Sequence, residues 1–96
     1  MERNPCIYIL ASRRNGTLYV GVTSCLQRRV WQHRNDIVEG FTSRYGVHRL
    51  VYYETCDSMY QAIEREKQIK SGSRRKKLEL IESLNPDWRD LYYEIV

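Results

Sequence analysis

Long apolar runs are absent from the sequence. The longest such runs span only a few residues, whereas a helix that crosses a bilayer needs about 20 consecutive apolar positions. The first residues, MERNP, do not carry the apolar stretch of a secretory signal. We therefore expect a soluble, cytoplasmic protein with no membrane partner.

Cysteine and histidine are also scarce. The three cysteines, Cys6, Cys25 and Cys56, are an odd number at wide spacings, which fits neither a disulfide framework nor a CxxC metal pair. We expect them to be reduced residues in or beside the core. Because His33 and His48 are the only histidines, a structural zinc site would need scattered ligands and is disfavoured.

The chain is short and basic. Its 96 residues suffice for one domain with a modest core. We expect this core at about 5–84, with a tail, 85–96, that packs back on it. The net charge of +4 and the pI near 9.1 favour polyanionic partners, because neutralised phosphates release counterions. Many unrelated small proteins are equally basic, so the charge alone is a weak indication.

A β-hairpin is predicted near the N-terminus. Residues 6–11 (CIYILA) and 18–22 (LYVGV) are β-branched and aromatic runs, and the Asn-Gly pair at 15–16 is the strongest short hairpin signal. A two-residue loop at that pair would place Leu10 opposite Gly21.

Side-chain alternation then separates the two faces of the hairpin. One face would carry Tyr8, Leu10, Tyr19 and Gly21. The other face would be wholly apolar, with Ile7, Ile9, Ala11, Leu18, Val20 and Val22. Any loop with an even number of residues gives the same faces, so the two phenols are expected side by side.

A first helix is predicted after the hairpin. Ser24 and Gln27 have the spacing of a capping box, so the helix should begin near Cys25 and end at Gly40. Residues 41–48 have the character of a loop.

The apolar stripe of this helix consists of Leu26, Val30 and Ile37. At about 100° per residue, His33 falls within the stripe and Arg29 lies at its edge.

A third strand, 50–54 (LVYYE), precedes a second helix. Asp57 or Ser58 should cap that helix, which runs through Lys70 and ends at Gly72. Ser73 should begin a third helix that the Asn-Pro pair at 85–86 ends; its apolar residues are Leu78, Ile81 and Leu84. The tail adds Trp88, Leu91 and Ile95 as apolar residues that would pack on the core.

The second helix breaks its own pattern at Glu66. Met59, Ala62, Ile63 and the stem of Lys70 form its apolar stripe, and Glu66 falls at the centre of that stripe. A buried lone charge is costly unless it is paired or bound to a metal. Glu66 therefore needs a partner.

Phosphodiester hydrolysis needs the residue types that these elements could bring together. A carboxylate such as Glu66 can hold a hard divalent ion, a cation such as Arg29 can stabilise the charge that develops on phosphate, and a base can activate water. Tyr8, Tyr19 and His33 are the candidates that could complete this set.

Each residue also has a simpler explanation. A strand tyrosine is usually half-buried packing, and a histidine on an apolar helix face is more often a satisfied core residue than a catalyst. The five basic residues at 70–77 are more often a solvated helix surface than a nucleic-acid contact. Glu66 is the hardest to explain in this way, although a buried ion pair with Arg29 would do so without catalysis.

Two short motifs, CIY at 6–8 and YVG at 19–21, are followed in order by Arg29, His33 and Glu66. In this order the residues resemble the GIY-YIG nuclease superfamily. That superfamily includes the N-terminal nuclease of the bacterial excision-repair incision protein, phage homing endonucleases and structure-selective junction nucleases. Any single motif is weak, but the ordered set is highly specific.

The likeness extends over about 5–88 and is strongest to the small stand-alone bacterial members, whose pattern is reproduced at 18–33, 50–54 and 64–70. The resemblance implies a single α+β domain of β-β-α-β-α-α order, in which helices flank a three-stranded antiparallel sheet. It also implies a Mg²⁺- or Mn²⁺-dependent endonuclease that hydrolyses phosphodiester bonds of DNA, or of RNA with less preference.

The resemblance assigns roles to the candidate residues. Tyr19, or His33 as the competing candidate, would activate the attacking water, which Tyr8 would position. Arg29 would steady the phosphate and Glu66 would hold the metal ion. A tyrosine, with a reference pKa of about 10, serves as a base at neutral pH only if the metal or Arg29 lowers that value. The basic residues expected to contact nucleic acid are Arg28, Lys70, Arg74, Lys76 and Lys77.

Two positions depart from the family pattern. Cys6 replaces the first glycine, which alters packing more than chemistry because the hydroxyl of Tyr8 comes two residues later. The late asparagine of repair and homing members has no counterpart at 78–84, and Asn85 lies too far along the chain to be assigned to it. The second hypothesis is therefore a module that retains the fold and binds nucleic acid or a protein partner without turnover.

Overall fold

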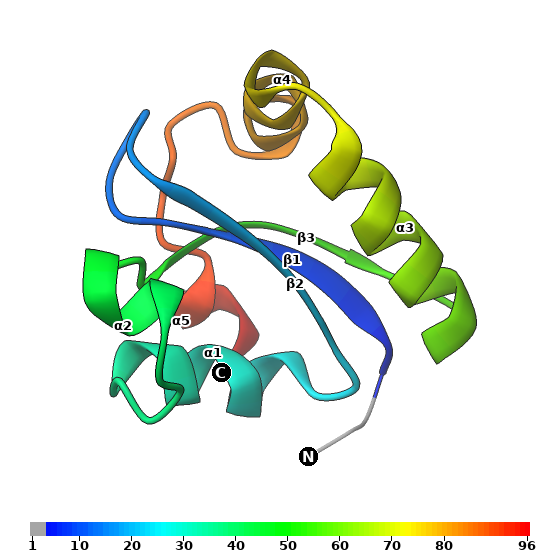
Figure 1. Ribbon diagram of the computed structural model, residues 1–96, viewed down its shortest axis with the longest axis horizontal. Coiled ribbons are helices and arrows are strands. Elements are labelled where there is room, and N and C mark those ends of the chain that lie inside the picture. The colour runs from blue at the N-terminus through cyan, green and yellow to red at the C-terminus, as the bar shows by residue number, and fades with distance from the viewer. Residues whose placement is uncertain (1–3) are drawn as a thin grey trace.

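A three-stranded antiparallel sheet lies at the centre of the fold (Figure 1). The computed structural model describes residues 4–96, and within them β1 (Cys6–Ala11) runs between β2 (Leu18–Thr23) and β3 (Arg49–Thr55). All six residues of β1 are buried, because the strand has a neighbour on each side and helices over both faces. The predicted α+β class with its antiparallel sheet is confirmed.

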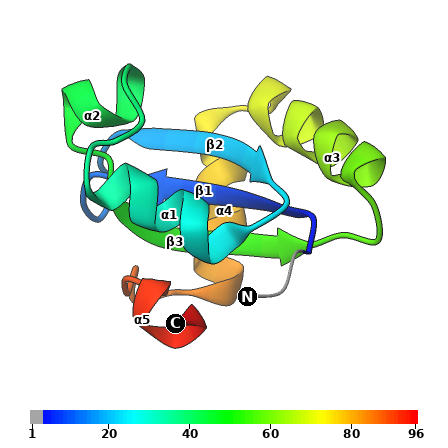
Figure 2. The same cartoon turned by 90° about the horizontal axis from the view of Figure 1, so that it is seen from below.

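Five helices of the described chain cover the sheet. α1 (Leu26–Arg34), α2 (Phe41–Tyr45) and α5 (Tyr92–Ile95) lie on one face, whereas α3 (Met59–Ser71) and α4 (Arg74–Leu84) lie on the other (Figure 1, Figure 2). The predicted element order is present, with α2 and α5 as additional short helices. None of the described helices is long and apolar enough to span a membrane. The first three residues, on which the signal-peptide prediction partly rests, lie outside the described chain.

Each face of the sheet has its own apolar cluster. The cluster under α3 and α4 includes Ile7, Ile9, Val20, Val51, Ile81 and Trp88. The cluster under α1 and α5 consists of Tyr8, Leu10, Val30, Val47, Leu50 and Leu91. Because strand side chains alternate between faces, neighbouring β1 residues enter different clusters. The tail contributes to both clusters, through Trp88 on one face and Leu91 on the other.

The hairpin loop has four residues rather than the predicted two. Gly16 N donates to Arg13 O at 2.9 Å, and Ser12 N donates to Thr17 O at 3.0 Å. Asn15 has a left-handed φ of 57°, as an Asn in a turn often does, but it occupies a later position in a longer turn. The Asn-Gly pair therefore identified the hairpin correctly and its loop length incorrectly.

The strand register changes with the loop. Tyr8, rather than Leu10, lies opposite Gly21, and Leu10 pairs with Tyr19. Because the loop still has an even number of residues, every side chain keeps its predicted face. Tyr8 and Tyr19 accordingly share the face that α1 covers.

α1 ends at Arg34 rather than at Gly40. Asp36 has a left-handed φ of 53°, which breaks the helical path. Ile37 therefore lies beyond the helix and is 55% exposed, so it is not part of the apolar stripe. The segment predicted as a loop, 41–48, contains the short helix α2.

Two of the three predicted helix caps are present. Ser58 accepts a hydrogen bond from the backbone in the first turn of α3, and Ser73 does the same for α4. The predicted capping box at Ser24 is not formed, because the N-cap of α1 is Cys25 and its side chain makes no capping bond. Thr23 Oγ1 instead accepts from Cys25 N at 3.0 Å.

The buried side of α3 is narrower than predicted. Ala62 and Ile69 are buried against the sheet, whereas Met59 and Ile63 are 37% and 38% exposed. α3 packs on β2 and β1. Leu84 at the end of α4 is likewise exposed, against expectation. Cys6 and Cys25 are buried and Cys56 is half-buried, with no disulfide among the described residues.

Candidate active site

The phenol of Tyr8 crosses the sheet directly over Gly21. A Cβ atom at Gly21 would lie 2.4 Å from both the Cζ and the hydroxyl oxygen of Tyr8, closer than any real Cβ contact. Tyr8 itself is 1% exposed. The glycine of the YVG motif is thus the residue that lets a phenol from β1 lie across β2.

Tyr8 begins a chain of hydrogen bonds that connects three elements of the fold. Its hydroxyl oxygen lies 3.0 Å from Nε2 of His33 on α1, and Nδ1 of His33 lies 2.8 Å from Oγ1 of Thr42 on α2. All three side chains are essentially inaccessible to solvent. His33 reaches this position because it lies on the apolar stripe of α1, three residues after the buried Val30.

The imidazole of His33 is neutral at physiological pH. Its pKa is lowered to about 4, mainly by burial, with smaller contributions in the same direction from the charge of Arg29 and from His48. A neutral imidazole has one donor and one acceptor nitrogen. His33 can therefore accept a proton, but only at the nitrogen that does not already carry one.

The pKa of Tyr8 is raised well above its ordinary value. Burial is the main cause, and the neighbouring phenol of Tyr19 adds to it. Arg29 acts in the opposite direction, through its charge and through a hydrogen bond to Tyr8, whereas the charge of Glu66 raises the pKa slightly. Tyr19 of β2, Arg29 of α1 and Glu66 of α3 therefore all affect the pKa of the Tyr8 hydroxyl.

Tyr19 lies beside this chain of hydrogen bonds without joining it. Its ring centroid is 5.4 Å from that of His33 and 6.3 Å from that of Tyr8. Its other side stacks on Phe41 of α2 at 6.2 Å. Tyr19 is half-buried, so solvent reaches it, whereas Tyr8 is inaccessible.

A small pocket of about 290 Å³ lies at the end of β2 and the start of α1, and Arg28, Arg29 and Gln32 line it. Arg29 donates to Oε1 of Gln32 at 3.3 Å. The pocket therefore carries two arginines, and the charge of one of them, Arg29, acts on the hydroxyl of the buried Tyr8.

Glu66 has a partner, but it is Lys70 rather than Arg29. Oε2 of Glu66 lies 2.9 Å from Nζ of Lys70, and the two side chains are 14% and 52% exposed. α3 carries Glu66 along the β2 side of the sheet (Figure 2). The pair follows the i,i+4 spacing of a helical ion pair, a signal that is visible in the sequence.

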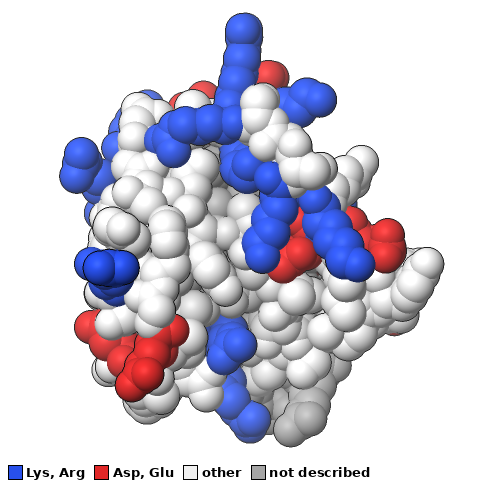
Figure 3. All heavy atoms as spheres, in the orientation of Figure 1, with Lys and Arg blue, Asp and Glu red and all other residues white. Residues whose placement is uncertain are grey.

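The basic residues predicted to contact nucleic acid fall into two groups. Arg28 and Lys70 lie near the residues described above, as pocket lining and as the partner of Glu66. Arg74, Lys76 and Lys77 belong to α4, which packs on β3, whereas α3 with Lys70 packs on β2 and β1. Figure 3 shows basic side chains gathered over α4 and the end of α3.

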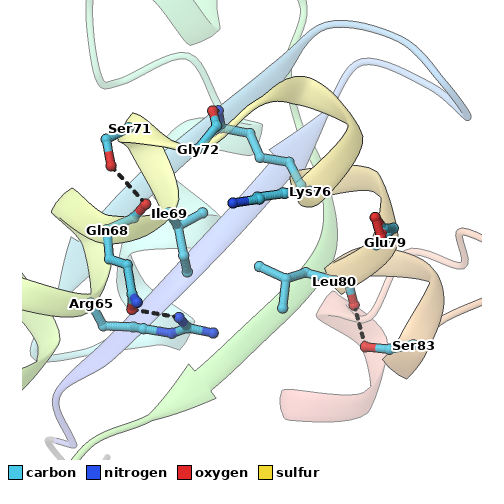
Figure 4. A pocket seen from close by; sticks show the side chains of 10 residues that line it. Arg65, Gln68, Ile69, Ser71, Gly72, Lys76, Glu79, Leu80 and Ser83 are labelled. Carbon is cyan, nitrogen blue, oxygen red and sulfur yellow. Dashed lines mark hydrogen bonds between the residues drawn. The ribbon is translucent and has the colours of Figure 1, made fainter.

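Two of the α4 cations bind backbone oxygens of the protein itself. Arg74 donates to the carbonyls of Asn15 and Gly16 at 2.9 and 2.7 Å, which fastens the hairpin loop to α4. Lys77 donates to Gly72 O at 2.7 Å, at the end of α3. Lys76 lines a pocket of about 530 Å³ between α3 and α4 (Figure 4), and Tyr8 is not among the residues that line it.

Asn85, which the sequence did not allow us to assign to the family's late asparagine, bonds to backbone groups. It is buried, and its side chain donates to Val51 O and Arg89 O at 3.2 and 2.8 Å. It also accepts from Arg89 N at 3.0 Å. Asn85 therefore holds the tail against β3.

Thr42 is the member of the site that the sequence did not reveal. A buried histidine needs a partner at each nitrogen, so a second partner for His33 was implied. Its identity depends on the path of the chain between α1 and β3, in a segment predicted as a loop.

Comparison with known proteins gives matches over most of the chain. The model of the GIY-YIG catalytic domain matches residues 4–79. A UPF0213 protein of Staphylococcus saprophyticus is 37% identical over 75 residues, which cover 78% of this chain and 90% of the relative. A UPF0213 protein of Natronomonas pharaonis is 42% identical over 83 residues, which cover 84% and 94%.

A solved structure also resembles the fold. The solution NMR structure of a UPF0213 protein from Bacillus halodurans matches with a TM-score of 0.56 at 30% sequence identity. The match covers 91% of this chain and 92% of the other. Sequence and structure therefore point to the same set of small proteins.

Proposed function

Because the chain belongs to the GIY-YIG family, we propose that it is a metal-dependent endonuclease that hydrolyses phosphodiester bonds of nucleic acid, DNA in preference to RNA. The observation that carries the proposal is the buried hydrogen bond between Tyr8 and a neutral His33, beside Arg29. Nucleases of this superfamily in repair and homing act on DNA, which supports the preferred substrate.

The Tyr8 and His33 pair can act as the base. As water attacks the phosphorus, its proton moves to the Tyr8 oxygen while the Tyr8 proton moves to Nε2 of His33. The new P–O bond forms, the bond to the leaving oxygen breaks, and that oxygen takes a proton from solvent. A concerted transfer suits the raised pKa of Tyr8, because no free phenolate has to persist.

This scheme gives the two tyrosines different roles from those implied by resemblance. The hydrogen bond to His33 supports Tyr8 as the proton acceptor. Tyr19, half-buried beside both rings, can orient the attacking water. Arg29 can bind the phosphate oxygens and stabilise the charge that develops on them, since a guanidinium matches phosphate geometry.

Glu66 is the residue that would hold Mg²⁺ or Mn²⁺. Its carboxylate is a hard oxygen ligand, and Lys70, its present partner, is half-exposed and can swing aside. One carboxylate suits Mg²⁺, which keeps several waters and binds substrate phosphate. When bound, the ion would neutralise phosphate charge and lower the pKa of a coordinated water.

The test is cleavage of single-stranded, duplex and branched oligonucleotides with Mg²⁺ and with EDTA. Glu66→Gln should lower the Mg²⁺-dependent rate by about 100-fold or more, because the metal loses its protein ligand. Glu64→Gln is the matched control: it lies on the same helix, is 55% exposed and is 4.0 Å from Lys67. Its rate should stay at the wild-type level.

Two results would contradict the proposal. Equal cleavage by wild type and Glu66→Gln would mean that the activity comes from a contaminant. Salt-dependent binding of the same oligonucleotides by the wild type, without any cleavage, would favour the non-catalytic binding module instead.

A further inference from the structure

Thr42 is the buried residue of an otherwise exposed helix. It is 2% exposed, whereas its neighbours on α2, Phe41 and Tyr45, are 45% and 53% exposed. Gly40 and Gly46 bracket the helix with φ values of 114° and 64°, which other residues rarely adopt. The chain therefore makes a specific detour that brings one hydroxyl to the far side of His33.

We propose that Thr42 is a positioning residue whose Oγ1 accepts the Nδ1–H of His33 and thereby keeps the Nε2 lone pair directed at Tyr8. The proposal rests on the proposed function, because it is the nuclease reaction that requires His33 to take a proton from Tyr8. Thr42 itself touches neither the water nor the phosphate in this scheme.

The direction of the hydrogen bonds follows from Arg29. The charge of Arg29 acts on the Tyr8 hydroxyl, and because a guanidinium can only donate, it favours the arrangement in which the lone pairs of the Tyr8 oxygen face Arg29. The Tyr8 proton is then directed at Nε2 of His33, which must be the unprotonated nitrogen. The single proton of the neutral ring is left on Nδ1, where Thr42 Oγ1 lies 2.8 Å away.

The opposite tautomer would block the reaction. If Thr42 donated to Nδ1, then Nε2 would carry the ring proton and could not accept one from Tyr8. In the proposed direction, the proton leaves the Tyr8 oxygen, Nε2 binds it with its lone pair, and Nδ1 keeps its own proton. The ring becomes an imidazolium and Thr42 stays neutral.

The Oγ1 of Thr42 matters because the other surroundings of His33 disfavour the protonated ring. Arg29 of α1 and His48 beside β3 both disfavour a positive ring, and burial does so more strongly. Two phenols face the ring, Tyr8 of β1 at 5.9 Å and Tyr19 of β2 at 5.4 Å between ring centroids. The Oγ1 of Thr42 therefore supplies the negative end of a dipole to the transient imidazolium.

Ring nitrogen NMR of the full-length protein tests the proposal without substrate. Long-range ¹H–¹⁵N spectra at pH 7 distinguish protonated from unprotonated ring nitrogens, and the loss of signals in His33→Gln separates His33 from His48. The wild type and Thr42→Ser should show His33 protonated at Nδ1. Thr42→Val should lose this preference and show the Nε2–H form or a mixture.

Kinetics give the second measurement. Thr42→Val should lower kcat by about tenfold or more with an unchanged KM, as expected when the group that orients a catalytic residue is lost. Thr42→Ser should restore the rate. Thr55→Val, which removes a hydroxyl from an exposed position at the end of β3, is the control and should change neither the spectrum nor kcat.

A wild-type His33 protonated at Nε2 would overturn the proposal, and so would a Thr42→Val protein whose tautomer and kcat match the wild type. If Thr42→Val does not fold, the wild-type and Thr42→Ser spectra still decide the tautomer. If the spectra agree but the wild type cleaves no nucleic acid, the proposed function fails while the orientation of His33 by Thr42 stands.

Discussion

Two tyrosines on opposite faces of the sheet have contrasting partners. On the α1 face, the hydroxyl of Tyr8 meets the neutral imidazole of His33. On the α3 face, Tyr52 donates to Glu54, which also accepts two hydrogen bonds of 2.9 Å from Arg65. Both phenols have a raised pKa, and burial is the main cause for each.

The difference lies in what the partner can do with a proton. The hydrogen bonds from Arg65 hold the pKa of Glu54 below its ordinary value, so this carboxylate does not take a proton near neutral pH. His33 is neutral and can take one. Burial of a phenol is therefore common to both faces, and only the Tyr8 face combines it with a proton acceptor.

The largest expected effect is on catalysis. Tyr8→Phe should lower the cleavage rate by about 10²–10⁴-fold, because it removes the group that transfers the proton. Tyr52→Phe should leave the rate near the wild-type level, although each variant should lose about 1–2 kcal/mol of stability with its buried hydrogen bond. Initial cleavage rates and urea unfolding measure both quantities. An equal loss of rate in the two variants would remove the distinction between the faces.

A smaller effect concerns stability in acid. The pKa of His33 is about 4 in the folded protein, compared with about 6.5 when unfolded. The unfolded chain therefore binds the extra proton first, and stability that is complete above about pH 6.5 is lost as the pH falls toward 4. The loss amounts to about 3 kcal/mol at pH 4, at about 1.4 kcal/mol per pKa unit.

Urea unfolding between pH 7 and pH 4 tests this prediction. The stability of His33→Gln should depend less on pH than that of the wild type, by about the same 3 kcal/mol. His48→Gln is the control, because His48 is an accessible residue paired with Asp36, and it should retain most of the wild-type dependence, since burial rather than His48 is the main cause of the lowered pKa of His33. Parallel curves for wild type and His33→Gln would mean that the histidine is not a buried neutral base.

How far the sequence predicted the site depended on the kind of signal. The shared face of Tyr8 and Tyr19 follows from the period of two along a strand, and it survived a register error because that error was an even number of residues. Thr42 could not be found in this way. Its helix is a single turn without an apolar period, and its position depends on the backbone angles of Gly40 and Gly46.

For the charged residues too, the sequence predicted some contacts and not others. The apolar stripe of α3 indicated correctly that Glu66 is mostly buried. The i,i+4 spacing of Glu66 and Lys70 is the spacing of their ion pair, so that pair could have been predicted from the sequence. The functions of Arg74 and Lys77 were not readable from sequence, because their partners are backbone carbonyls of the hairpin loop and of α3. The basic cluster at 70–77 thus contains cations of two kinds: some are surface charges, and others bind backbone carbonyls and stabilise the fold.

The smallest expected effect concerns Arg65. Arg65→Met should destabilise the protein by about 1 kcal/mol or less at pH 7, because the pair with Glu54 is 32% and 26% exposed and solvent screens it. Because the pKa of Glu54 is lowered in the folded protein, this contribution is complete above the ordinary titration range of a glutamate and should shrink at an acidic pH below that range. Urea unfolding at the two pH values measures it, with Lys67→Met as the exposed control. Cleavage should be unchanged, since Arg65 and Tyr52 both bind Glu54, which has no role in the proposed reaction. A cleavage defect in Arg65→Met as large as that of Tyr8→Phe would show that the two faces are coupled.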